Sequence, residues 1–580
     1  MAIVAVPVVV GALSLVGQTW YPVGDWASML FRIGQVGSSD TPTVGAYTVK
    51  GWAHPGPFLY YAATPLYRVT SGDPRAMSWT AAVLNVTTIA AIGAVAWRRG
   101  RLVLTVAVLL LVALLVHGLG PDLLVDLWNP YVGLLPFLLV VLLAWDAGLG
   151  RPRSALLAVI PAVVAVQSHV AYVPLVAVVA VWLACWCRWW RRLVPGELSA
   201  GALVAVTPPE GRWRAWRPVL GRGVLVAAVL SLPVLVDLAF DTHNLARVAD
   251  HLAAGSGEQI GLVDGLGLVS RYARPDGPWM GGPEPMAWGD VQGSGPLVAV
   301  AVIGLLVGCA LAARRRGLID VAALATLTLT LVLVSVPATA NIVTPVFTYL
   351  TQWLKVVGGL VWFTVGWTGW RLVEDRVTAP NVRRTVGATA VAGVVGAALW
   401  TVAPATDVEL AAETEGAVVQ DLRAQLADQL DPDLTYRVEG VADSYGHNAA
   451  GLIAYLIADG YDVLTTDGAA GLKWGHAHRW SEGDDVDVRL TVAVHYGGSW
   501  RDAYRECEGD PDVELVAAHD ALTPDERARR EDGRRAAFLS PETFSEAERA
   551  EVRRLEADGF RVGVFAGTSG CATRAPRPNP

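Results

Sequence analysis

One polar stretch near the N-terminus, residues 18–78, holds the side chains best suited to chemistry. Asp25 lies in the run Gly24-Asp25-Trp26, just before apolar residues that recur at helical spacing. A carboxylate there can act as a general base, or it can be the N-cap of the following helix. The spacing alone favours the cap.

A second polar group follows in the run Lys50-Gly51-Trp52-Ala53-His54-Pro55-Gly56-Pro57. Proline is favoured in the first turn of a helix, so Pro57 predicts a helix start whose unpaired N–H groups point toward His54 and Lys50. Such a helix end binds phosphate readily. The alternative is that the Pro-Gly-Pro turn only redirects the chain and that His54 packs against a tryptophan. The residues favour neither interpretation.

Three further places offer polar side chains to a substrate. Asp237 and Asp241 are four residues apart and would share one face of a helix at the end of an apolar run. Arg271, in the loop that follows, is able to clamp a phosphate, and His169 lies in a turn of a long apolar run. In the alternative interpretations, Asp237 only lies near water, Arg271 is a solvated loop residue, and His169 only packs against its neighbours.

These residues must be positioned by a membrane-embedded chain. Hydrophobic residues make up 53% of the 580, charged residues only 17%, and the mean hydropathy is +0.41, which is too apolar for a soluble enzyme. The net charge of −8 arises from acids in the last third of the sequence, so nucleic acid is not an expected partner.

Ten apolar segments are long enough to be spanning helices. They are residues 1–16, 81–97, 102–119, 131–145, 155–187, 224–240, 297–313, 319–336, 356–370 and 386–402. The fifth must be two helices that turn near Gln167, His169 and Pro174, which predicts about eleven transmembrane helices. We take the first segment to be an anchor, with a cleaved signal peptide as the alternative.

Arginine clusters fall after every second predicted crossing, and positive residues stay in the cytoplasm. The N-terminus is therefore expected on the cytoplasmic side of the plasma membrane. The loops 18–78 and 241–296 and the whole C-terminal tail are expected outside it.

The predicted membrane domain covers residues 1–403, and residues 404–580 form a small extracytoplasmic α/β domain. Its strands are expected at 434–438, 488–494 and 561–565 and its helices at 449–456 and 545–555. Because the exterior is oxidising, Cys507 and Cys571 are expected to form a disulfide, with two free thiols as the alternative. No Walker loop or GxGxxG motif occurs in the sequence, so nucleotide-driven chemistry is not supported.

The order of these features resembles the GT-C glycosyltransferases, which include the protein O-mannosyltransferases and the aminoarabinose transferase of lipid A. The runs 24–26, 43–47 and 51–57 are also similar to actinobacterial members of that superfamily. The resemblance implies that Asp25 is the catalytic base and that His54 replaces a lysine that holds the donor phosphate. Family members often carry a second acid beside the first. Trp26 stands there instead, so a divalent cation is left as an open possibility and no cofactor is assigned.

The implied reaction moves a hexosyl or pentosyl group from a polyprenyl phosphate to a hydroxyl of a cell-envelope glycan, lipid or protein, with inversion, as in cell wall biosynthesis. His54, Lys50 and Arg271 would neutralise the donor phosphate. Substrate contacts would come from Asp237, Asp241, His169 and Trp52. One rival function is a polyprenyl-lipid or glycan transporter, but the sequence does not show the repeated halves that are common in transporters. The other is a non-enzymatic, membrane-anchored protein that binds envelope glycan, but eleven helices are more than an anchor needs.

Overall fold

The computed structural model describes residues 1–48, 50–189, 212–254, 257–285, 291–377, 380–443, 447–465, 472–496, 503–539 and 545–571. The chain forms two compact units, which are considered separately. The membrane unit comprises Met1–Gln18, Thr43–Ala46 and Ala53–Glu409. The C-terminal unit comprises Thr19–Pro42, Tyr47–Trp52 and Leu410–Pro580, so the first polar loop contributes residues to both units.

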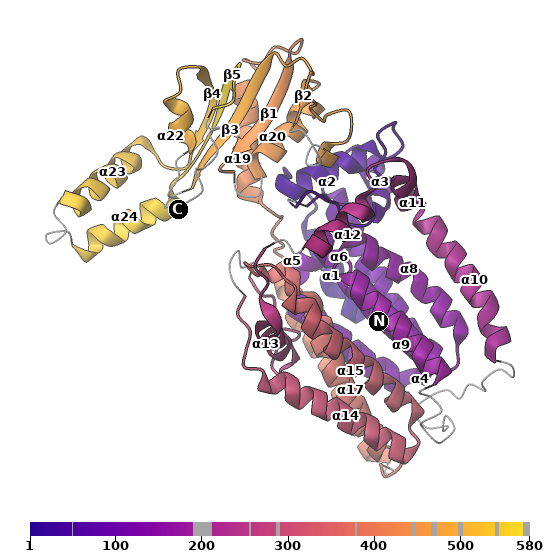
Figure 1. Ribbon diagram of the computed structural model, residues 1–580. Helices are drawn as coiled ribbons and strands as arrows, with labels where there is room; N and C mark the ends of the chain where they lie inside the picture. Colours follow the sequence, from indigo (N-terminus) through magenta and orange to yellow (C-terminus); the bar gives the residue numbers. More distant parts are fainter. Residues whose placement is uncertain are drawn as a thin grey trace. The chain divides into compact units, whose positions relative to one another are not determined.

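The membrane unit is a helical bundle, in which α14, α15 and α17 lie side by side (Figure 1). Its helices are α1 (Ala2–Ser14), α3 (Phe58–Val69), α4 (Ala76–Leu119), α5 (Pro121–Val125), α6 (Asn129–Val132), α7 (Leu134–Gly148), α8 (Pro152–Ser168), α9 (Tyr172–Arg188), α10 (Arg212–Leu230), α11 (Leu232–Phe240), α12 (Asn244–Ala254), α13 (Gly261–Ala273), α14 (Leu297–Arg316), α15 (Ile319–Ala340), α16 (Thr348–Thr351), α17 (Trp353–Val373) and α18 (Pro380–Ala405).

All the apolar segments picked out in the sequence are helical. The long run 155–187 divides into α8 and α9, with its turn at residues 169–171, where the polar residues predict it. Segments 81–97 and 102–119 form the two halves of α4, which is broken at Gly100 and at Arg101, where φ is +51°.

Within the described residues, five helices are long and apolar enough to cross a membrane, or six if α10 and α11, bent by 65°, form one span. Helices α1, α8 and α9 are apolar but shorter. Several such helices in one bundle make the chain a multi-pass membrane protein. The count of eleven crossings stays a prediction.

The C-terminal unit is built on a five-stranded sheet in the order β2-β1-β3-β5-β4. Strand β1 is parallel to β2 and β3, whereas β5 is antiparallel to β3 and β4. The strands are β1 (Thr435–Val441), β2 (Asp462–Leu464), β3 (Val488–Tyr496), β4 (Val513–Asp520) and β5 (Phe560–Gly567). The helices are α2 (Gly24–Gln35), α19 (Glu413–Leu426), α20 (His447–Ala458), α22 (Ala503–Glu508), α23 (Pro524–Leu539) and α24 (Glu546–Asp558), with the short 3₁₀ helix η3 (Leu472–Trp474).

This unit confirms the predicted strands and helices and adds elements that the sequence did not indicate. Strands β2 and β4 and helices α19, α22 and α23 were not predicted. Helix α2 was predicted from its periodicity, but not its partner. Val23 and Ala27 lie in the same hydrophobic core as Leu452 of α20.

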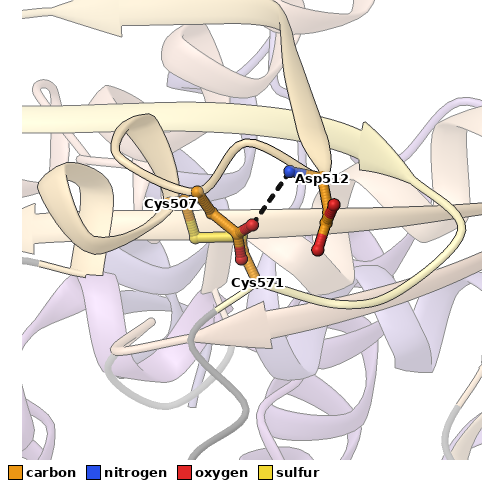
Figure 2. Close-up of a disulfide and its surroundings, with 4 residues drawn as sticks. Cys507, Asp512 and Cys571 are labelled. Atoms are coloured by element: carbon orange, nitrogen blue, oxygen red, sulfur yellow. Dashed lines mark hydrogen bonds between the residues drawn. A yellow bond between two sulfur atoms is a disulfide. The ribbon is translucent and has the colours of Figure 1, made fainter.

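Cys507 and Cys571 form a disulfide between α22 and the chain that follows β5 (Figure 2). Both cysteines are fully buried, in a small cluster with Tyr504 and Phe565. Beside the bond, the backbone N–H of Asp512 donates a hydrogen bond of 3.0 Å to Asp510. The disulfide closes a long loop that contains β4, α23, α24 and β5.

Removing this disulfide should destabilise the C-terminal unit. The bond joins residues 64 positions apart, and closing a loop of that length stabilises a domain by about 2–4 kcal/mol. The double variant Cys507→Ser, Cys571→Ser should therefore unfold at a lower temperature in the full-length protein, as measured by intrinsic fluorescence. Cys185→Ser in α9 is the control and should leave that transition in place. An unchanged transition in the double variant would contradict the stabilising role.

Buried ion pairs connect the helix ends of the membrane unit. Arg99 of α4 donates to the carboxylate of Asp146 of α7, at 2.5 Å, and the two side chains are 0% and 1% exposed. The same carboxylate accepts a hydrogen bond from Ser154 of α8. In a second pair, Arg371 of α17 lies 2.9 Å from Asp320 of α15. The first set of contacts therefore joins α4, α7 and α8, and the second joins α15 and α17.

Candidate functional site

Asp25 lies in the first turn of α2 and is not its N-cap. The helix begins at Gly24, and the N-cap position belongs to Val23. The cap interpretation favoured by spacing is therefore wrong. A carboxylate in the first turn is stabilised by the helix dipole, and the side chain of Asp25 remains 39% exposed.

Two residues of the C-terminal domain, Lys473 and His447, lie beside the start of α2. The ammonium of Lys473, on η3, lies 3.3 Å from Oδ1 of Asp25. Gly24 has a φ of +58°, and a Cβ there would come within 2.5 Å of the ring of His447, the first residue of α20. Glycine is thus required at residue 24 by both its backbone conformation and the space available.

The far end of α2 is tied to the chain after η3. Arg32 forms a hydrogen bond with Gln35 and lies 3.7 Å from Asp40. Asp40 also accepts a hydrogen bond of 3.2 Å from the backbone N–H of His476. Between these groups Gly475 has a φ of +88° and leaves no room for a side chain beside Asp40. The Lys473 segment is therefore held against both ends of α2.

In the membrane unit, His54 is buried beside His169. The two ring centroids are 4.3 Å apart. Nδ1 of His54 accepts a hydrogen bond from the N–H of Val170, and Nδ1 of His169 accepts one from Ala171, each 3.2 Å long. In a neutral ring that accepts at Nδ1, the proton is on Nε2. His54 thus packs against a histidine from the α8–α9 turn.

Burial keeps both histidines neutral at pH 7. It lowers the pKa of His54 well below its usual value, and the neighbouring His169 lowers it further. Burial also lowers the pKa of His169 to about 4. His54 can therefore offer a donor phosphate a neutral N–H but no positive charge, which changes the role expected from the sequence.

The buried histidines should make the stability of the protein pH-dependent. An unfolded histidine has a pKa of about 6.5. As the pH falls below that value, the unfolded chain binds protons that the folded chain does not, so the free energy of unfolding falls. For His169 the loss continues until the pH reaches about 4. Unfolding midpoints measured from pH 7.5 to pH 4.5 in detergent should therefore decrease.

A His169→Gln variant separates this effect from the titration of carboxylates. It removes one buried imidazole, so its unfolding midpoint should depend less steeply on pH than that of the wild-type protein, whatever its midpoint at pH 7. Equal slopes in the two proteins would contradict the assignment.

Asp237 and Asp241 hold a corner of the chain. The buried carboxylate of Asp237 accepts hydrogen bonds from the backbone N–H groups of Thr242 and Asn244, so it caps the start of α12. Asp241 lies beyond the end of α11 at Phe240, so the two acids do not share a helical face as predicted. Asp241 instead accepts a hydrogen bond of 2.7 Å from Thr43.

Asn244 completes this corner. Its side-chain amide both donates to and accepts from the backbone of Ala53, each at 2.8 Å. The residue before His54 is thereby fixed to the α11–α12 corner. Asn244 was not selected from the sequence, because an asparagine after a helix usually indicates no more than a turn.

Arg271 belongs to a mixed-charge cluster. It lies 2.7 Å from Glu284, and Lys355 of α17 lies 3.4 Å from the same carboxylate. Tyr272 donates a hydrogen bond to Glu284, and Lys355, 0% exposed, also donates one to the carbonyl of Gly118. The cluster holds two cations and one carboxylate. Lys355 was missed because it stands one residue before the predicted span 356–370, where a lysine usually marks only a boundary.

Lys50 and Trp52 are the last two residues selected from the sequence. Lys50 is exposed. The carbonyl of Trp52 accepts hydrogen bonds of 2.8 and 2.7 Å from the backbone and hydroxyl of Thr48, which closes a tight turn. Within the described ranges, no group of three or more His, Cys, Asp or Glu side chains is placed to hold a metal ion.

A largely apolar groove of about 1020 Å³ runs between α4, α17 and α18. Trp279, Trp362 and Trp367 contribute to its lining, together with leucine and valine side chains of α4. Gly359 also lines it, one helical turn after Lys355 on α17. Since residues four apart share a helix face, the Arg271–Glu284–Lys355 cluster adjoins one end of the groove.

No family model and no curated protein sequence matches the chain. Among solved structures, ArnT from Cupriavidus metallidurans bound to undecaprenyl phosphate matches with a TM-score of 0.52 at 16% identity, over 89% of this chain and 95% of that one. The same enzyme in the apo state gives 0.49 at 14% identity, over the same shares. The archaeal oligosaccharyltransferase AglB from Archaeoglobus fulgidus gives 0.40 at 12% identity, over 84% of this chain and 69% of that one. The match to lipid-bound ArnT extends over nearly the whole of both chains, so this protein has the GT-C membrane fold to which its sequence pointed.

Proposed function

We propose that the protein is a membrane glycosyltransferase that moves a sugar from a polyprenyl phosphate to a hydroxyl of a cell-envelope acceptor. The observation that carries the proposal is the fold shared with an enzyme whose structure contains undecaprenyl phosphate. The exposed carboxylate of Asp25, in the first polar loop, supports it. The sugar is a hexose or a pentose, and the acceptor is a glycan, lipid or protein.

In the proposed reaction the acceptor oxygen attacks the anomeric carbon as Asp25 takes the proton from the acceptor hydroxyl. The bond between that carbon and the phosphate oxygen breaks, and its electron pair leaves with the phosphate. The products are the glycosylated acceptor with inverted configuration and the polyprenyl phosphate, and Asp25 returns its proton to water. The phosphate is a good leaving group, so charge neutralisation matters more than a general acid.

The cluster around Arg271 is proposed to supply that neutralisation. Arg271 and Lys355 together exceed the charge of Glu284 by one, and the side chain of Arg271 is 34% exposed. The adjoining groove between α4, α17 and α18 has the apolar lining that an isoprenoid chain needs. His54 and His169 would add neutral N–H donors, and exposed Lys50 a further cation. Asp237 and Asp241 would affect substrate binding indirectly, by holding the α11–α12 corner in place. Trp52 would do so by closing its turn with Thr48.

Transfer of radiolabelled sugar by the purified, reconstituted protein tests the proposal. Polyprenyl phosphates loaded with different hexoses and pentoses would be offered with envelope extracts as acceptors. We expect labelled acceptor from one donor class. Accumulation of substrate inside sealed vesicles without any transfer would instead identify a transporter. Retention of envelope glycan without either activity would identify a binding protein.

A further inference from the structure

The proposed base is contacted by a cation from a distant part of the chain. Asp25 and Lys473 are 448 positions apart in sequence, yet both belong to the C-terminal unit, and 3.3 Å separates the ammonium from Oδ1. The lysine side chain is 18% exposed. A flexible surface lysine would normally sample many rotamers, so the position of its backbone decides whether the pair persists.

The backbone of Lys473 is fixed on both sides. The next residue, Trp474, is buried in the core of the unit and packs edge-on against Phe31 of α2, with ring centroids 5.6 Å apart. Gly475 then passes against Arg32 and Asp40 where no side chain would fit. The N–H of His476 is bonded to Asp40. Three successive residues thus anchor the η3 segment to α2 and to Asp40, which follows that helix.

The ion pair between Lys473 and Asp25 is not needed to hold η3 in place. An ion pair that water reaches contributes little to folding, because solvent screens it and ordering two side chains costs entropy. The contacts of Trp474 and His476 would hold η3 in place without a cation at residue 473. The position of Lys473 is therefore better explained by what its ammonium does to the Asp25 carboxylate.

We propose that Lys473, a residue of the C-terminal domain, is a positioning residue for Asp25. The inference rests on the proposed function. By holding Oδ1, the ammonium sets the direction from which the carboxylate meets the acceptor hydroxyl. A misplaced base lowers the rate of proton transfer without weakening donor binding, since misplacement by about 1 Å can cost roughly 10²-fold.

The test compares Lys473→Gln with Lys473→Arg in the full-length protein. We expect Lys473→Gln to lower kcat by about 10- to 100-fold, with the KM for the lipid donor and the unfolding midpoint unchanged. Lys473→Arg keeps a cation beside Asp25 and should recover most of the rate. The control is Arg554→Gln in α24, which removes another ion-paired surface cation of the same unit, 3.0 Å from Glu551, and should leave kcat unchanged.

The outcomes separate this inference from the proposed function. Wild-type transfer by Lys473→Gln would overturn the inference and leave the glycosyltransferase intact. A rise in donor KM alone would also overturn it, because Lys473 would then bind the donor phosphate instead of orienting the base. Equal losses in Lys473→Gln and Lys473→Arg would do the same. No transfer by the wild-type protein with any donor would overturn the proposed function and the inference together.

Discussion

Replacing Asp25 by asparagine is expected to lower sugar transfer by about 10²–10⁴-fold, the usual contribution of a general base. The amide keeps the size of the side chain and can still accept a hydrogen bond from Lys473, which lies 3.3 Å from Oδ1. It cannot take the proton of the acceptor hydroxyl. The loss should therefore appear in kcat, measured from initial rates with saturating lipid donor, and the donor KM should stay near the wild-type value.

Folding is the first alternative explanation to remove. Asp25 is 39% exposed and contributes no cap to α2, so the variant should elute and unfold like the wild-type protein. Asp433→Asn is the control, because it neutralises another exposed carboxylate of the same unit. Wild-type turnover by Asp25→Asn would remove the base assignment while leaving the fold unaffected.

The periodic features of the sequence were enough to predict the apolar helices of the bundle and some of the elements of the C-terminal unit. Apolar runs of sufficient length predicted the helices of the bundle, and the spacing of Trp26, Met29 and Ile33 predicted α2. The packing partner of α2 could not be predicted. Val23 packs into the core with Leu452 and Val419, and a single sequence contains no signal that links residues about 400 positions apart.

The same limit applies to the site. The sequence selected His54 and His169 separately. For His54 it favoured neither packing nor a ligand, and for His169 packing was the usual interpretation. Only the structure shows that the two rings are in contact, with centroids 4.3 Å apart, and that both side chains are buried. Lys473 was not selected at all, because a lysine in a polar segment is usually solvated. Its relation to Asp25 comes from the tertiary fold, through Trp474 and Gly475 on the same short segment.

The buried ion pairs of the bundle predict a second large effect, on stability. Asp146→Ala should lower the free energy of unfolding by about 3–5 kcal/mol, because it leaves a buried cation without its partner. Arg99 is 0% exposed, its Nε bonds to the lost carboxylate, and its Nη1 has no hydrogen-bond partner in the described part of the chain. The remaining cation nearby, Arg151, lies 3.8 Å from the same carboxylate and would add repulsion.

Thermal unfolding of the detergent-solubilised protein measures this loss, and two further variants identify its cause. Asp276→Ala breaks the exposed pair with Arg274 and should not move the transition. Removing both charges of the buried pair, with Arg99→Met and Asp146→Leu, should restore much of the lost stability, since a buried ion pair can often be replaced by apolar groups of similar volume at little cost. If the double variant were as unstable as Asp146→Ala, the loss would come from packing around α4 and α7, and the uncompensated charge of Arg99 would not be its cause.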